Sequence, residues 1–187
     1  MLTYSKERVE VQSVLNSALT EALRLSEAEL GNVQLMDWDA GCLEIASQRG
    51  FGDEFLTFFK KVTIDGGSAC ARALRGREPI IVEDVLSDFA FTSCRTIACS
   101  AGFRAVQSTP MVSSSGAFIG ILSTHFQSPH RPSDPTMAAL KELAGSTANA
   151  IVRGRSKMND VKTTIERSIE RMEESYRLLA LTDRTTR

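Results

Sequence analysis

Four cysteines and two histidines are the residues of this 187-residue chain whose types suit nucleophilic or metal chemistry. The cysteines are Cys42, Cys70, Cys94 and Cys99, and no two of them form a Cys-x-x-Cys pair. Close pairs of that kind are typical of structural zinc sites, so we expect no metal site. The first residues lack an apolar signal core, so we expect reduced thiols that are mostly buried as small hydrophobic side chains.

Neither histidine completes a recognisable catalytic motif. His125 lies in an apolar stretch that predicts a β-strand, where a lone histidine is more often a hydrogen-bonded packing residue than a general base. His130 lies in a proline-rich loop, and we expect it to cap or to face solvent. The chain has neither a glycine-rich phosphate loop nor a Gly-x-Ser-x-Gly elbow. We therefore expect no enzyme activity.

The composition excludes several classes of protein. Hydrophobic residues make up 42% of the chain and charged residues 24%, which is enough apolar surface for one core with an appendage. The formal net charge of -1 argues against a polyanion binder, so we expect no nucleic-acid partner. No stretch approaches 18 apolar residues, so we expect no membrane span and a cytoplasmic location.

The apolar pattern divides the chain into two helical ends and a mixed centre. Steps of three and four predict helices, and strict alternation predicts strands. The segment Asp84–Gly102 has no period, and a long irregular segment inside a compact domain is commonly functional or covers something. The expected elements are a helix over 5–29, a hairpin over 32–45, short helices over 53–61 and 68–75, strands over 79–82, 105–111 and 118–126, and a helix over 133–181.

The last part of the chain carries a narrow apolar seam. Beyond Gly154 the apolar residues from Met158 to Leu179 follow steps of 3, 4, 4, 3, 4 and 3, which is a heptad pattern with one stutter. Such a seam must be covered, either by its own domain or by a second copy of the same helix. We favour a parallel dimer. The predicted dimer contacts are Val161, Ile165, Ile169, Met172 and Leu179.

Six stretches follow one another in a familiar order and spacing: Gly31–Leu35, Gln48–Phe51, Gly67–Leu74, Val82–Val85, Gly102–Pro110 and Gly120–Ser133. Together they resemble the GAF modules of bacterial sensor proteins, especially sensor histidine kinases, over about residues 8–152. The resemblance implies an α+β fold with an antiparallel sheet of about five or six strands. The terminal helices would cover one face, and short helices and loops would cover a small-ligand pocket on the other. The implied divisions are an N-terminal helix over 1–31, a GAF sensory domain over 32–152 and a signalling helix over 153–187.

The residues expected to line this pocket come from strands and from the irregular segment. Strand alternation puts Gln107 and Thr109 on the same face as Ala105, where a pocket would need polar groups. These two side chains could equally face solvent or satisfy loop backbone groups, and Asp84 could equally cap the loop that follows it. The predicted ligand-binding residues are Cys70, Asp84, Phe91, Cys99, Gln107, Thr109 and Thr124.

The resemblance implies a regulatory domain rather than an enzyme. It would sense an unidentified small molecule, form a homodimer and relay its state through the C-terminal helix to an output domain. That output would be a histidine kinase of a two-component system or a diguanylate cyclase, and residues Leu179–Asp183 resemble the junction that opens diguanylate cyclase domains. The sequence identifies no cofactor.

Two alternative functions stay open. The stretches Gly67–Cys70 and Ile97–Cys99 resemble active-site segments of the free methionine-R-sulfoxide reductases, which are GAF enzymes. Cys99 would then be the nucleophile and Cys70 the resolving thiol. The carboxylates that hold the substrate's ammonium group in those reductases are replaced here by Ser100, Val106, Ser123 and His125.

The other alternative is a structural dimerisation module with a filled core and no ligand.

The same family also includes domains that bind bilin chromophores and domains that bind cyclic nucleotides. Bilin-binding GAF relatives attach their chromophore to a cysteine that is followed by histidine. Here Cys94 is followed by Arg95, and Cys99 by Ser100, so we expect no covalent bilin. Cyclic-nucleotide binding has no short diagnostic motif and stays open.

Overall fold

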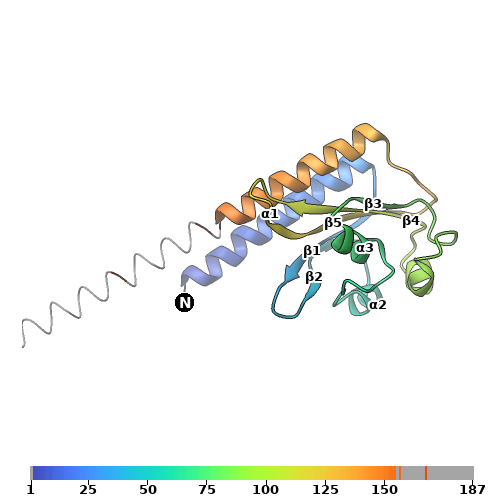
Figure 1. Ribbon diagram of the computed structural model, residues 1–187, viewed down its shortest axis with the longest axis horizontal. Helices are drawn as coiled ribbons and strands as arrows, with labels where there is room; N and C mark the ends of the chain where they lie inside the picture. The colour runs from blue at the N-terminus through green and yellow to red at the C-terminus, as the bar shows by residue number, and fades with distance from the viewer. Residues whose placement is uncertain (1, 155, 157–166, 168–187) are drawn as a thin grey trace, which may run out of the picture. The chain divides into compact units, whose positions relative to one another are not determined.

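A computed structural model describes residues 2–154, 156 and 167 of the chain (Figure 1). The chain divides into a compact unit over Met1–Ile151 and a second unit over Val152–Arg187. The junction Leu179–Asp183 and the residues of the predicted dimer seam lie outside the described residues. Those seam residues are Val161, Ile165, Ile169, Met172 and Leu179.

A five-stranded antiparallel sheet forms the centre of the first unit, with the strand order β2-β1-β5-β4-β3. The predicted α+β class is confirmed, with five strands. The strand expected over residues 118–126 has those bounds, and the strand expected over 105–111 extends one residue further. The strands are β1 (Leu30–Asp37), β2 (Cys42–Arg49), β3 (Ile80–Val82), β4 (Ala105–Val112) and β5 (Phe118–Phe126).

Helices cover both faces of the sheet (Figure 1). On one face lie α1 (Leu2–Ser26) and the helix that begins at residue 134. On the other lie the short helices α2 (Asp53–Phe58), α3 (Ala69–Gly76), η1 (Thr92–Cys94) and α4 (Arg95–Ser100). The expected division into a layer of terminal helices and a layer of short helices is therefore confirmed, and the two layers are called here the helix side and the cavity side.

The helix side is tightly packed against β1. A Cβ atom on Gly31 would lie 2.9 Å from the Ser123 carbonyl oxygen and 3.0 Å from the side chains of Leu19 and Leu23 in α1. Only glycine allows this close approach of helix and strand. The first helix, expected over residues 5–29, ends at Ser26, because Glu27 takes a left-handed φ of 54° and turns the chain into β1.

The cavity side contains more helix than the sequence predicts. The segment from Asp84 to Gly102, expected to be irregular, holds both η1 and α4, and we call it the cover segment. The prediction missed α4 because this helix has six residues and no side-chain hydrogen bond at its N-cap. A helix so short shows less than two turns of apolar period.

The three phenylalanines at positions 55, 58 and 59, in the segment predicted as a helix over 53–61, do not all lie on one side. Phe55 and Phe59 are buried, whereas Phe58 is 50% exposed. Phe55 and Phe59 are four residues apart, and their rings contact in tilted geometry with centroids 4.6 Å apart, so they form one face toward the sheet. The next helix, α3, begins at Ala69, one residue after the expected start, and Ser68 is its N-cap, whose hydroxyl accepts a hydrogen bond from the Ala71 amide at 3.3 Å.

Candidate functional site

A small cavity lies on the cavity side of the sheet, with a volume of about 10 Å³. This is room for about one water molecule. The polar side chains at its wall come from four elements that are far apart in the sequence. They are Asn32 of β1, Ser68 and Cys70 at the start of α3, Ser108 of β4, and Ser123 and His125 of β5.

Strand pairing places these polar side chains in a row across the sheet. Asn32 pairs with Ser123, and Ser123 pairs with Ser108, so the three side chains share one face. The Ser108 and Ser123 hydroxyls form a hydrogen bond of 2.7 Å. His125 lies two residues along β5 on the same face.

Three side chains on this face hold buried polar atoms that have no hydrogen-bond partner among the described residues. The atoms are Asn32 Oδ1, His125 Nδ1, and both Oε1 and Nε2 of Gln34. Gln34 lies one step further along β1, paired with Ile121 outside the cavity wall. We call Asn32, Gln34 and His125 the cavity cluster. Each buried polar atom without a partner costs about 1–3 kcal/mol of folding free energy, so the cluster is an unusual feature of a core.

Aromatic rings surround the imidazole of His125. Its ring centroid lies 4.9 Å from that of Phe51, 5.9 Å from that of Phe55 and 4.7 Å from that of Phe103, in edge-to-face geometry. Burial lowers the pKa of His125 to about 3, against a weaker opposing effect of a hydrogen bond with the Leu30 backbone. The imidazole is therefore neutral at physiological pH.

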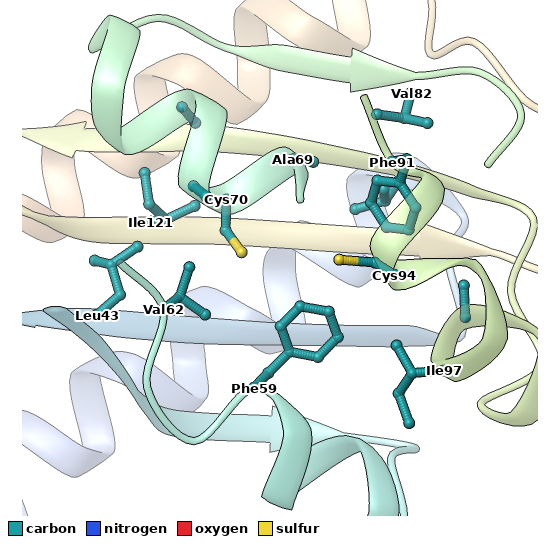
Figure 2. Packing of buried hydrophobic residues seen from close by; sticks show 14 of the residues in the cluster. Leu43, Phe59, Val62, Ala69, Cys70, Val82, Phe91, Cys94, Ile97 and Ile121 are labelled. Atoms are coloured by element: carbon teal, nitrogen blue, oxygen red, sulfur yellow. The ribbon is translucent and has the colours of Figure 1, made fainter. Parts of the chain in front are cut away.

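Two buried thiols face each other across the core. Figure 2 shows the sulfur atoms of Cys70 and Cys94 pointing toward one another. Burial raises the pKa of Cys70 to about 11, and burial also raises the pKa of Cys94. Thiolate is the reactive form, so both thiols are poor nucleophiles at neutral pH.

The structure does not support a reactive pair of Cys70 and Cys99. Cys99 is exposed on α4, whereas Cys70 is buried at the wall of the cavity. The thiol that faces Cys70 belongs to Cys94 (Figure 2). A nucleophile and its resolving thiol must meet for a disulfide to form, and this arrangement brings a different pair together.

Asp84 holds the cover segment rather than the cavity. Its carboxylate accepts two hydrogen bonds from the Arg104 guanidinium, at 3.1 and 2.7 Å, and one from the Leu86 amide at 3.0 Å. The bond from Arg104 is the main cause that lowers the pKa of Asp84. Asp84 therefore caps the start of the cover segment, which is the alternative that the sequence left open.

Gln107, Thr109 and Thr124 lie on the helix side of the sheet, away from the cavity. Thr124 pairs with Gly31, whose missing Cβ would point at α1, so these side chains face the same way. Gln107 Nε2 donates to Thr124 Oγ1 at 3.1 Å, and Thr109 Oγ1 donates to Gln107 Oε1 at 2.8 Å. We call these three residues the helix-side cluster. The prediction grouped them on one face correctly, but that face is the one the terminal helices cover.

Of the seven predicted ligand-binding residues, Cys70 and Phe91 meet at the cavity wall. Sequence reasoning missed Asn32, Ser108 and Ser123, and it treated His125 as a packing residue. In β4, strand alternation places Val106 and Ser108 on the opposite face from Gln107, as the structure also does. The face of β4 that carries Ser108 was therefore the signal in the sequence for the cavity wall. Strand alternation alone does not tell which of two faces holds a cavity.

Three arginines hold the cover segment in place over the cavity. Arg72 of α3 forms an ion pair of 2.9 Å with Asp88, and Asp88 Oδ1 accepts a hydrogen bond of 3.0 Å from the Phe91 amide. Arg95 donates to the Val85 and Asp88 carbonyl oxygens, at 3.0 and 3.1 Å. Together with the Arg104–Asp84 pair, these contacts fix the backbone that carries the Phe91 ring.

Gly67 allows the cover segment to close. A Cβ atom at this position would lie 2.0 Å from the Ala90 carbonyl oxygen, which is far inside van der Waals contact. The backbone next to Phe91 therefore rests directly on the turn before α3. Any side chain at residue 67 would push the cover segment away from the cavity.

A larger groove, of about 710 Å³, runs between α1, β2 and α2. Three of its polar side chains bond within the protein, since Gln12 donates to the Ala46 carbonyl at 3.0 Å and Ser47 donates to Asn16 Oδ1 at 2.7 Å. The groove is open to solvent and holds none of the unpaired buried atoms. We therefore place the candidate site at the small cavity.

The described residues also bear on metal binding and membrane insertion. In the part of the chain that the structure describes, no group of three or more His, Cys, Asp or Glu side chains could hold a metal ion. No helix among residues 2–154 is both long and apolar enough to cross a membrane.

Comparison with solved structures shows similarity to domains of signalling proteins. A domain from Sinorhizobium meliloti 1021, described as part of a two-component sensor histidine kinase, has 20% sequence identity and a TM-score of 0.64, covering 79% of this chain and 94% of that chain. The GAF domain/HD domain protein from Geobacter sulfurreducens has 20% identity and a TM-score of 0.66, covering 79% and 95%. The PixJ GAF domain from Thermosynechococcus elongatus, in its blue-light absorbing form, has 16% identity and a TM-score of 0.64, covering 86% and 93%. At these identities the likeness shows the fold.

The family comparison covers most of the chain. No curated protein matches the chain. The family model described as "GAF domain" matches residues 9–152, which include the whole sheet and the helices on both of its faces. The chain therefore belongs to the GAF domain family.

Proposed function

We propose that this chain is the small-molecule-sensing regulatory domain of a cytoplasmic signalling protein. The ligand binds in the cavity between Asn32, His125 and the cover segment. Its presence changes the position of the cover segment, and that change is relayed to an output domain such as a histidine kinase or a diguanylate cyclase. The domain itself catalyses no reaction.

The observation that carries this proposal is the cavity cluster. Asn32 Oδ1 and His125 Nδ1 are buried at the cavity wall without a partner among the described residues. A folded core normally satisfies such atoms, so atoms left over at a cavity wall are suited to a guest that brings the missing hydrogen bonds. The GAF family and the sensor proteins that share its fold support the same conclusion.

The cover segment supplies a way in. The cavity holds about 10 Å³ when closed, so a ligand larger than water must displace a side chain. Phe91 comes from the cover segment, and the Arg72–Asp88 ion pair that holds its backbone is only partly buried, with about a fifth of each side chain exposed. Breaking that pair costs less than opening a packed helix, so the cover segment is the moving part of the proposed sensor.

A filled core without a ligand is the competing function, and the small volume of the cavity favours it. In that case the domain would serve as a structural dimerisation module. The two functions differ in what the protein carries when it is purified. A sensor holds its ligand in the cavity, whereas a structural module holds at most a water.

Native mass spectrometry of protein purified from its own host separates these functions. The wild-type chain should carry a small molecule, and Asn32→Leu should lose it, because the variant removes an unpaired acceptor at the cavity wall. Thr109→Val is the matched control, since it changes a buried polar side chain on the helix side, and it should keep the molecule. A wild-type chain that carries nothing would show that the core is filled, and an Asn32→Leu chain that carries as much as a loaded wild type would show that the molecule does not bind at this cavity.

The relay requires a dimer, which we place at the apolar seam beyond Gly154. The heptad steps of this seam suit a parallel pair of identical helices. The double variant Ile165→Asp, Ile169→Asp should sediment as a monomer, because it buries two carboxylates in that seam. Dimers that persist in this variant would place the interface elsewhere.

A further inference from the structure

The wall of the cavity carries no formal charge. None of the lining residues that the structure describes is Asp, Glu, Lys or Arg. The titratable groups at the wall are His125 and Cys70, and burial keeps the first deprotonated and the second protonated at neutral pH. A charged ligand in this cavity would be buried without a counter-charge, which is strongly unfavourable.

The arginines near the cavity are already engaged with the cover segment. Arg72 pairs with Asp88, and Arg104 pairs with Asp84. Arg95 donates to two backbone carbonyl oxygens of the same segment. An anionic ligand would have to break one of these bonds to gain a partner, and the cover segment would then lose its support.

The apolar walls are aromatic. Phe103 lies at their centre, with its ring 6.2 Å from that of Phe55 and 6.4 Å from that of Phe91, both edge-to-face. Phe59 completes this side of the cavity. Aromatic rings pack well against the faces and edges of other rings, so these walls favour a flat, unsaturated guest.

The Phe91 ring sets the size of the guest. Its side chain is 2% exposed, and it is carried by the cover segment, which is held by the arginine and Asp88 contacts and by a backbone hydrogen bond of 2.7 Å from the Val85 amide to the Arg104 carbonyl oxygen. When the Phe91 ring moves out of the core, the cavity gains a volume equal to that of one aromatic ring. Asn32 Oδ1 lies at the same cavity and requires a hydrogen-bond donor.

We infer that the cavity binds an uncharged, ring-sized aromatic or heteroaromatic molecule with an N–H or O–H donor, which takes the place of the Phe91 ring and donates to Asn32. This inference rests on the proposed sensor function and names the class of its ligand. The ring of the guest packs among Phe55, Phe59 and Phe103. Its polar group lies at the end of the cavity where Asn32 and His125 meet.

Four probes of similar size test each part of this inference by isothermal titration calorimetry with the full chain, freed of bound small molecules. Phenol is neutral and has a donor, toluene is neutral without a donor, benzoate is an anion and benzylammonium is a cation. Phenol should bind best, and each of the other three should bind about tenfold more weakly or worse. Benzoate or benzylammonium binding as tightly as phenol would overturn the inference, as would the failure of all four to bind.

Three variants locate the binding of phenol. Asn32→Leu should remove the preference for phenol over toluene, whereas Thr109→Val, on the helix side, should keep it. Phe91→Leu should bind phenol several-fold more tightly, because less of a side chain must be displaced. An unchanged preference in Asn32→Leu, or binding no tighter in Phe91→Leu, would contradict the placement of the guest.

The outcome is separable from that of the proposed function. A charged molecule found on the host-purified chain would uphold the sensor function and overturn this inference. A host-purified chain that carries no small molecule would overturn the sensor function itself.

Discussion

The two faces of one sheet treat buried polar side chains in opposite ways. On the helix side, the amide of Gln107 donates to Thr124 and accepts from Thr109, and all three residues are fully buried. On the cavity side, Gln34 is equally buried, yet neither of its amide atoms has a partner within the described part of the chain. The helix side is complete as it stands, and the cavity side lacks partners. This difference is the basis of our proposal that the cavity side of the sheet, rather than the helix side, receives a ligand.

The largest expected effect comes from breaking the complete side. Gln107→Met keeps the length of the side chain but leaves the hydroxyls of Thr109 and Thr124 without their partners. Two buried hydroxyl groups that lose a bond should lower the free energy of unfolding by about 2–4 kcal/mol. Urea denaturation followed by circular dichroism measures this change, and a loss well below 1 kcal/mol would mean that the helix-side cluster is not closed as described.

The next largest expected effect is the pH dependence of stability that His125 causes on the cavity side. The pKa of His125 is about 3 in the folded chain, against 6.5 for an ordinary histidine, because burial disfavours the imidazolium. The unfolded chain therefore binds a proton below about pH 6.5 that the folded chain does not bind. Stability is full above that pH and should fall by about 1.4 kcal/mol for each unit of pH below it.

The measurement is the free energy of unfolding at several pH values between 6.5 and 5, and His125→Phe is the control. This variant keeps an aromatic ring among Phe51, Phe55 and Phe103 but cannot titrate. It should flatten the pH dependence. Equal slopes for the wild type and His125→Phe would show that the imidazole is already protonated or reaches water.

A smaller effect follows from lifting the cover segment. Gly67→Ala adds a Cβ atom where the Ala90 carbonyl oxygen lies at 2.0 Å, and overpacking of this kind costs about 1–3 kcal/mol. The displaced segment should also expose the thiols of Cys70 and Cys94 to a thiol reagent such as dithionitrobenzoate. Gly76→Ala is the matched control, since a Cβ there would meet nothing within 4 Å. Similar thiol reactivity in the two variants would mean that Gly67 does not set the closure.

The smallest effect sharpens the comparison of the two faces. Gln34→Met is the same substitution as Gln107→Met, but it removes an amide without partners and leaves no other group unpaired. It should leave stability unchanged or raise it by about 1 kcal/mol. The informative result is the sign of the change in the free energy of unfolding for each variant. If Gln34→Met lowers this free energy by about as much as Gln107→Met does, the two faces do not differ in the way described.

Strand positions could be predicted from the pattern of apolar residues, and the resemblance to GAF modules implied the order of the layers. The apolar stretch over residues 118–126 matched the bounds of β5, and Ser68 marked the start of α3. The helix α4 could not be predicted in this way, because six residues without a capping side chain show neither a period nor a cap.

The candidate site was predicted in part. Cys70 and Phe91 were placed at the cavity, but Gln107, Thr109 and Thr124 were placed on the wrong side of the sheet for it. Alternation divides a strand into two sets of residues, and both sets of β4 are almost fully buried here. The side that holds the cavity depends on which helices pack there, and that is a property of the whole fold. Cys99 was misplaced for a related reason, because its exposure depends on the helix that the sequence did not reveal.

The most direct test of the proposed ligand site on the cavity side is a crystal structure of the protein purified from its own host. We predict density for a small molecule in the cavity, with polar atoms within hydrogen-bond distance of both Asn32 Oδ1 and His125 Nδ1, and with the Phe91 ring displaced. A structure in which these two atoms are bonded to protein groups, and in which Phe91 fills a cavity that holds no guest, would contradict the account.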